Sequence, residues 1–251
     1  MTTHKKRLPA SEKVFQLVLY ILLIAMTLSF IIPFLLVLGT SFVTKEEVAR
    51  RGFVFFPEQW STMAYDMMLF QNNEVWRAYG VTFFRVVVGT LCSLLVTGTF
   101  AYAMSKRGLP GRMFFLVLSF ITMIFYGGLI PSYLVIKSLG LIDSVWCFIL
   151  PNLMSVWNML ILRNFFYSIP ESLEESALLD GATPMTIFFR IIGPLSMPAI
   201  ATIGLFYAVD QWLSYWNAML YITKSEMYPL QLVLRDILLK AEVALQNAQS
   251  G

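Results

Sequence analysis

The feature that most restricts the fold of this chain is a long apolar stretch near its start. Val14 to Gly39 contains no Asp, Glu, Lys or Arg. A helix that crosses the hydrocarbon core of a bilayer needs about 20 mainly apolar residues. The stretch therefore predicts a spanning helix, in which Pro33 is tolerated as a kink. It is too long for the apolar core of a signal peptide, and no small-residue cleavage site follows it.

Four later stretches predict four further spans. Only 13% of the 251 residues are charged and 58% are hydrophobic, whereas a soluble domain carries about 25% charged residues. We therefore expect an all-α polytopic membrane protein with five spans. The later spans are expected at Ala78–Met104, which holds Arg85; at Met113–Ile136, interrupted by Gly127, Gly128 and Pro131; at Val145–Leu162, which holds Pro151 and Asn152; and at Ser196–Ile222, which holds Asp210.

Several classes of function lack the residues that they need. The net charge of +3 is too small to suggest nucleic-acid binding. The chain has two cysteines, both in apolar runs, and one histidine, His4, so neither a metal cluster nor a His-based triad is expected. The phosphate-loop pattern G-x-x-x-x-G-K-[ST] and the nucleophile pattern G-x-S-x-G do not occur. We therefore expect no catalytic residues, cofactor or metal in this chain.

Positive charges in the flanks of the spans predict the orientation, because Lys and Arg concentrate in cytoplasmic loops. The N-terminal tail, residues 1–13, and the loop between the second and third spans should be cytoplasmic. By alternation, 163–194 is then cytoplasmic, while 41–77 and the end of the chain lie outside. The last apolar pattern, Pro229–Gln246, predicts an amphipathic helix rather than a sixth span, because it contains Arg235, Asp236, Lys240 and Glu242.

The cytoplasmic segment predicts a pair of short helices joined by a glycine turn. Ser168 and Glu171 fit a capping box, with Pro170 in the first turn. Gly181 fits the left-handed position after a helix, and Thr183 fits the N-cap of a second helix that begins at Pro184 and ends at Gly193-Pro194. On this local chemistry alone, a well-capped connector is the preferred interpretation, because capped helices are common.

The spacing within this segment resembles a known family. Glu175-Ser176-Ala177, Gly181, Ile191 and Pro194 resemble the cytoplasmic "EAA" loop of the membrane subunits of ATP-binding-cassette (ABC) importers. Ser176 stands where the family usually has Ala, and Gly193 where it usually has Leu. Four other stretches are similar to the carbohydrate permeases, and the likeness is greatest to the lipoprotein-associated, complex-oligosaccharide branch: LLDGATP (178–184), FFPEQWS (55–61), LGLIDSVWCFILP (139–151) and YWNAMLYI…YPLQLVLRDIL (215–238).

The resemblance implies a type I ABC importer fold, with one permease domain over residues 14–251. Such permeases normally have a sixth span and a short cytoplasmic tail. This chain stops before both, and we expect it to be a shortened form. The loop 163–194 would contain a coupling helix, residues 170–181, that carries the movement of an ATPase into the spans. The implied coupling residues are Glu174, Glu175, Ser176, Ala177, Leu178, Leu179, Asp180, Gly181, Ala182 and Pro184.

The same resemblance implies the partners and the location. A homologous second permease, two copies of an ATPase that binds ATP and Mg²⁺, and an extracytoplasmic solute-binding protein would complete the importer. It would lie in the bacterial cytoplasmic (inner) membrane, with the N-terminus of this chain in the cytoplasm. The transported solute would be an oligosaccharide. A fragment of a plant or algal polysaccharide fits the resemblance, which does not specify the length or charge of the sugar.

Polar and aromatic residues within the later spans predict a path for such a solute. Aromatic faces stack on sugar rings, and amides and carboxylates pair with hydroxyls. The expected path residues are Asp210, Gln211, Trp212, Tyr215, Trp216 and Asn217, with Asn152, Asn158 and Tyr126 as weaker candidates. Asp210 is interpreted equally well as a structural residue that bonds a neighbouring helix. Trp216 also fits an anchor at the membrane interface. For Arg85, snorkelling to the outer interface is preferred over contact with a ligand.

Two other functions remain open at this level. An ion-coupled secondary transporter would use Asp210 as its relay, but that class does not need the capped cytoplasmic helices. A membrane scaffold would transport nothing.

Overall fold

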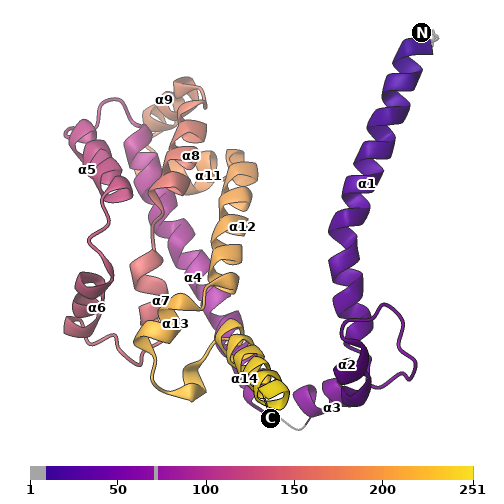
Figure 1. Cartoon of the computed structure of the whole chain (residues 1–251). Coiled ribbons are helices and arrows are strands. Elements are labelled where there is room, and N and C mark those ends of the chain that lie inside the picture. Colours follow the sequence, from indigo (N-terminus) through magenta and orange to yellow (C-terminus); the bar gives the residue numbers. More distant parts are fainter. Residues whose placement is uncertain (1–9, 71–72, 251) are drawn as a thin grey trace. The chain divides into compact units, whose positions relative to one another are not determined.

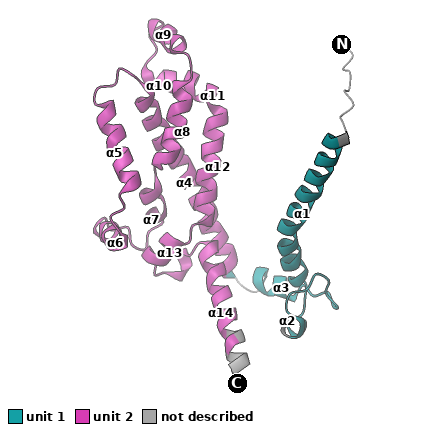
Figure 2. Ribbon diagram, turned by 45° about the horizontal axis from the view of Figure 1, so that its top comes forward, with its two compact units in different colours: residues 1–73 teal, residues 74–251 magenta. Residues whose placement is uncertain are grey.

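The computed structural model describes residues 10–70 and 73–250, and within these ranges the regular elements are all helical. The chain divides into two compact units, residues 1–73 and 74–251 (Figure 2), and each is described by itself. His4 and the first three basic residues of the predicted cytoplasmic tail lie outside the described ranges.

The first unit contains α1 (Ala10–Thr40), with Pro33 inside it, followed by α2 (Lys45–Arg51) and α3 (Met63–Leu69). α1 has the length and hydropathy of a spanning helix, and no part of its most apolar window is buried by the rest of the unit. In the loop that follows, the Thr44 side chain caps α2. The buried Glu47 carboxylate accepts hydrogen bonds from the Glu58 N–H (3.0 Å) and from Arg51 (2.8 Å). This loop therefore has a folded polar core.

The second unit is built along α4 (Asn73–Ser105), which is long and apolar enough to cross a membrane (Figure 1). Three bent helix pairs are packed in the same unit. They are α5 (Arg112–Ile124) with α6 (Leu129–Ser138), bent by 117°; α7 (Trp146–Ile149) and η1 (Leu150–Asn152) with α8 (Val156–Tyr167), bent by 53°; and residues 184–195 with α12 (Met197–Leu213), bent by 86°. If each pair is one span, the described helices supply up to five spans, in agreement with the predicted number.

The predicted spans are less regular than expected. The prediction of a continuous helix over Ser196–Ile222 is wrong, because α12 ends at Leu213 and a separate helix, α13 (Trp216–Tyr221), follows. The backbone becomes extended at Ser214 (ψ 119°), and Arg85 Nη1 donates a hydrogen bond to the Ser214 carbonyl. The third predicted span is two helices joined at Gly128, whose φ of 96° is readily adopted only by glycine.

Two hydrophobic cores hold the second unit together. One joins α4, α8, α12 and residues 177–192 around Met159, Leu162 and Phe188. The other joins α6, α7 and α13 around Phe148 and Ile149. The predicted amphipathic helix is confirmed as α14 (Leu230–Ser250), and the Leu230 N–H at its start donates to the Thr82 hydroxyl of α4 (2.8 Å).

Candidate functional site

In the segment predicted to be cytoplasmic, residues 163–194, α8 is followed by α9 (Glu171–Leu179), which lies at one end of the second unit (Figure 2). The predicted capping box is wrong. Ser168 directly follows α8 as its C-cap residue, where its hydroxyl donates to the Phe165 carbonyl, and its helical conformation is unsuited to an N-cap. Pro170 takes the extended conformation and begins α9 without a side-chain cap. Glu171 and Glu174 then lie in the first turn, where the helix dipole favours negative charge.

The glycine turn after α9 is confirmed. Gly181 has φ 81°, in the left-handed region. Its N–H donates to the Leu178 carbonyl (3.0 Å), and the Ala182 N–H donates to the Ala177 carbonyl (2.9 Å). These two bonds define a Schellman motif, which satisfies the last carbonyls of the helix and fixes the direction of the chain.

The second short helix is also capped as predicted, but it ends differently. Thr183 Oγ1 accepts from the Thr186 N–H at the start of α10 (Pro184–Ile187). The chain does not end its helical path at Gly193-Pro194. It continues through a π-helix, η2 (Phe188–Ile192), and α11 (Gly193–Leu195) to a break at Ser196. The segment is therefore one capped turn joined directly to the start of α12.

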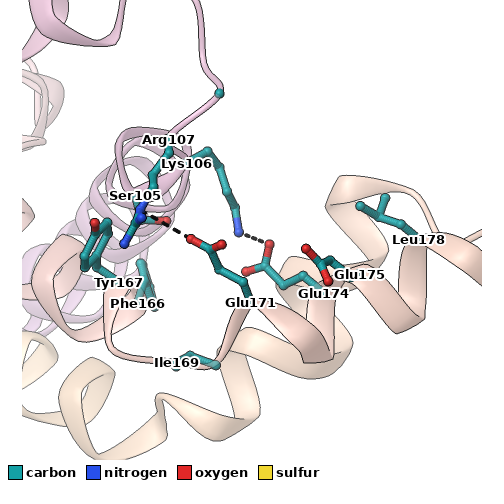
Figure 3. A pocket seen from close by; sticks show the side chains of 11 residues that line it. Ser105, Lys106, Arg107, Phe166, Tyr167, Ile169, Glu171, Glu174, Glu175 and Leu178 are labelled. Atoms are coloured by element: carbon teal, nitrogen blue, oxygen red, sulfur yellow. Dashed lines mark hydrogen bonds and ion pairs between the residues drawn. The ribbon is translucent and has the colours of Figure 1, made fainter.

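Two ion pairs attach α9 to the loop after α4 (Figure 3). Lys106 pairs with Glu174, and Arg107 Nε lies 3.4 Å from Glu171 Oε1. The Lys106 ammonium also lies over the Tyr102 ring, 4.1 Å from its centroid. These contacts border a pocket of about 230 Å³, which Glu175 and Leu178 also line. These ion pairs join the acidic first turn of α9 to the loop after α4.

Large apolar side chains of the segment are exposed beside these acidic residues. Leu178 is 54% exposed, Leu179 is 90% exposed and Met185 is 62% exposed. Ala177 is buried, Glu174 and Ala182 are partly buried, and the other implied coupling residues are exposed: Glu175, Ser176, Asp180, Gly181 and Pro184. Large exposed apolar side chains on a rigidly held turn are suited to insertion into a cleft of a partner protein.

The predicted path residues between 210 and 217 lie together at the break between α12 and α13. Asp210, Trp212, Tyr215 and Trp216 are exposed, Asn217 is partly buried and Gln211 is buried. Trp212 contacts the Tyr79 ring (6.3 Å between centroids), and Tyr215 lies under the Arg235 guanidinium (5.5 Å). An exposed carboxylate beside exposed aromatic rings has the composition of a sugar contact.

Arg85 anchors this break from α4. Its Nε donates to Gln211 Oε1 (2.9 Å) and its Nη1 to the Ser214 carbonyl (2.7 Å). The guanidinium also lies over the Phe148 ring (5.0 Å) and interacts electrostatically with Asp210. The snorkelling interpretation is wrong, because Arg85 is only 1% exposed and its charge is held inside the protein.

The three weaker candidates are not joined to Asp210 by any hydrogen bond among the described residues. Asn158 is buried on α8, and Asn152 is partly buried in η1, where its carbonyl accepts from Ser93 Oγ (3.4 Å). Tyr126 is 75% exposed in the segment between α5 and α6. The structure thus brings the residues from 210 to 217 together and leaves these three on other elements.

Sequence reasoning did not identify two sets of contacts. In the sequence, Lys106 and Arg107 serve only to predict the orientation of the spans. The signal for their ion pairs is the opposite charge of the loop after α4 and the first turn of α9. Tyr207 joins Thr97 and the Ser155 N–H through its hydroxyl, but nothing in the sequence around Tyr207 indicates these partners.

Comparisons with known proteins agree with this geometry. Residues 86–215, about half the chain, match the family described as "Binding-protein-dependent transport system inner membrane component". The chain is 43% identical to the polygalacturonan/rhamnogalacturonan transport system permease protein YtcP of Bacillus subtilis, over 91% of this chain and 79% of that protein. It is also 43% identical to protein LplC of the same organism, over 88% of this chain and 74% of that protein.

A solved structure shares the fold. It is the crystal structure of a bacterial ABC transporter involved in the import of the acidic polysaccharide alginate, which matches with a TM-score of 0.87 and 32% identity over 92% of this chain and 82% of the matched chain. In this family the ATPase is a separate subunit. The chain belongs to the binding-protein-dependent transport system inner membrane component family, and it is a transmembrane permease subunit of an ABC importer.

Proposed function

We propose that this chain forms half of the translocation path for an oligosaccharide released from an acidic polysaccharide. A homologous permease would supply the other half, two ATPase copies would bind ATP and Mg²⁺, and an extracytoplasmic binding protein would deliver the solute. The N-terminus would be cytoplasmic. The substrate class is supported by the relatives and by the exposed aromatic residues at 212–216.

The coupling element of this proposal is residues 170–181 together with Ala182 and Pro184. The observation that carries it is the Schellman turn, which leaves Leu178 and Leu179 exposed next to the two ion pairs that join α9 to the loop after α4. A push on the exposed leucines would be transmitted to α4 without first bending the segment. The reaction itself, ATP hydrolysis, would take place in the partner subunit.

The test replaces Gly181 in the complete importer. No atom from elsewhere lies within 4 Å of a Cβ added at Gly181, so a side chain there projects into open space. Gly181→Trp should block docking by its bulk. Gly181→Asn is the matched control, because asparagine tolerates a positive φ. We expect the ATPase to co-purify with Gly181→Asn and to be lost with Gly181→Trp.

A second measurement distinguishes docking from transport. Binding protein loaded with an acidic oligosaccharide should raise ATP turnover in the wild type and in Gly181→Asn. Co-purification of the ATPase at the wild-type level with Gly181→Trp would show that this turn is a connector and would return attention to Asp210 as an ion relay.

A further inference from the structure

A basic pocket lies where α4, α5 and α8 meet, beside the coupling segment. Its volume is about 450 Å³, and three of its lining residues are arginines: Arg107, Arg112 and Arg163. The rest of the lining is apolar or glycine. This pocket has no part in the coupling geometry described above, apart from Arg107 at its edge.

Two of the arginines converge on one acceptor. Arg112 Nε and Arg163 Nε each donate to the Met104 carbonyl at the end of α4, and both distances are 3.0 Å. The C-terminus of a helix carries only about half an elementary negative charge. Two full positive charges therefore exceed what this helix end can balance, and the two guanidinium groups repel each other.

No carboxylate neutralises this excess within the described part of the chain. Arg107 is paired with Glu171, whereas neither Arg112 nor Arg163 makes an ion pair with a described residue. The only other described side-chain contact of the two is with the neutral Asn164 amide, from Arg163 Nη1 (3.3 Å). Both Nη groups of Arg112 and Nη2 of Arg163 have no described hydrogen bond and can donate to an anion, and a guanidinium binds phosphate oxygens in a bidentate manner.

Apolar surface adjoins these charges. Met113 is 73% exposed and Phe114 is 67% exposed in the first turn of α5, directly after Arg112. A free anion such as phosphate makes no favourable contact with these apolar side chains. A phospholipid does, because its acyl chains pass along a spanning helix while its head group stays at the interface. Basic pockets between spanning helices are suited to anionic head groups.

We propose that Arg112 and Arg163 bind the phosphate of an anionic phospholipid whose acyl chains lie against Met113 and Phe114. The lipid completes the charge balance at the end of α4, one turn from the ion pairs that hold α9. The site depends only on this chain and on the membrane, and it does not rest on the proposed substrate.

The experiment uses the importer purified with its partner subunits and exchanged into nanodiscs of phosphatidylcholine with or without phosphatidylglycerol. Lipids retained after ejection are counted by native mass spectrometry. The variant is Arg112→Gln/Arg163→Gln, since glutamine can still donate to the Met104 carbonyl. Lys137→Gln/Lys240→Gln, which removes two exposed charges elsewhere, is the matched control.

We expect the wild type and the control to retain phosphatidylglycerol in preference to phosphatidylcholine. The double arginine variant should bind it about thirtyfold more weakly, which corresponds to about 2 kcal/mol, or about 1 kcal/mol for each arginine near an anionic surface. Photoactivatable phosphatidylglycerol should label the wild-type peptide that contains Met113 and Phe114. This labelling needs no variant, so it tests the site even if the double variant fails to fold.

Four results would overturn the proposal. One is equal retention of the two lipids by the wild type, and another is equal retention of phosphatidylglycerol by both double variants. The third is displacement of the label by millimolar inorganic phosphate, which would make the site a phosphate site. If the label appears only after the ATPase has been removed, an acidic side chain of the partner occupies the pocket, and this result also contradicts lipid binding.

Discussion

Removal of one hydroxyl, that of Tyr207, should loosen the contact of three helices inside the second unit. Tyr207 lies on α12 and is 3% exposed. Its hydroxyl is 2.6 Å from Thr97 Oγ1 on α4, and it accepts from the Ser155 N–H (2.9 Å) at the start of α8. Tyr207→Phe keeps the ring and its packing, so the change in stability reports the two hydrogen bonds.

The magnitude follows from these two bonds. In soluble proteins a hydrogen bond contributes about 1 kcal/mol net, and an unsatisfied buried donor costs about 1–3 kcal/mol. Between spanning helices the average measured contribution is about 0.6 kcal/mol. Loss of both bonds, with the Ser155 N–H left unpaired, should therefore lower the free energy of unfolding by about 1–2 kcal/mol. Thr97→Val removes one of the bonds and should cost about half as much.

The assay is reversible unfolding of the purified chain in mixed detergent micelles. Tyr102→Phe is the matched control, because no hydrogen bond to the Tyr102 hydroxyl occurs among the described residues, and its stability should stay within about 0.5 kcal/mol of the wild type. The double variant Tyr207→Phe/Thr97→Val closes a thermodynamic cycle, whose coupling energy should be about 0.5–1 kcal/mol. A Tyr207→Phe effect no larger than that of Tyr102→Phe would refute the reasoning, as would a coupling energy of zero.

Three further predictions concern the surfaces of the two units. Lys106→Glu and Glu174→Lys should each reduce the ATP turnover stimulated by loaded binding protein, and the double exchange should restore most of it. Lys106→Arg, which keeps the charge, is the control. If the double exchange does not restore turnover, the ion pair does not hold α9. Hydrogen bonds from the Thr223 hydroxyl and N–H hold the pKa of Asp143 below its usual value; this stabilisation is complete above the carboxyl's unfolded pKa and is lost as the pH falls through the lower folded value. The stability advantage over Asp143→Asn should therefore be constant above about pH 5 and shrink in stronger acid, and a difference that grows in acid would contradict this. A Cβ added at Gly39 would lie 2.4 Å from the Phe55 carbonyl oxygen, so Gly39→Ala should cost about 1–3 kcal/mol and speed proteolysis of the loop after α1, while Gly80→Ala, with no neighbour within 4 Å, should not.

The local structure of the proposed coupling segment could be predicted from sequence, because the residues that determine it are only a few positions apart. The turn at Gly181 depends only on the positive φ of that residue. The cap at Thr183 depends only on a hydrogen bond from the N–H three residues later. The error at Ser168 has the same physical basis. Ser168 and Glu171 have the right spacing for a capping box, but the preceding helix extends to Tyr167 and holds Ser168 in a helical conformation. Spacing alone does not show which of two adjoining helices a residue belongs to.

The break between α12 and α13 and the start of α8 depend on partners far along the chain, which no local pattern contains. A helix that breaks inside a membrane protein leaves backbone groups without their usual partners, and these groups have to be satisfied within the protein. The Ser214 carbonyl is satisfied by Arg85, 129 residues away, and the Ser155 N–H by Tyr207. Apolar length could therefore predict how many spans there are, but not where Ser196–Ile222 would divide.

The same contacts separate two roles that polar residues in a span can have. Arg85 and Gln211 are buried and bonded to each other, and Arg85 Nη1 also bonds the Ser214 carbonyl, so these two residues hold the break, although Arg85 Nη2 has no hydrogen-bond partner among the described residues. Asp210, Tyr215 and Trp216 lie at the same break but are exposed. A rigid break that is satisfied from within holds its exposed side chains in fixed positions, which is what recognition of a sugar requires. The path residues proposed here therefore depend on Arg85, although Arg85 itself is buried away from any solute.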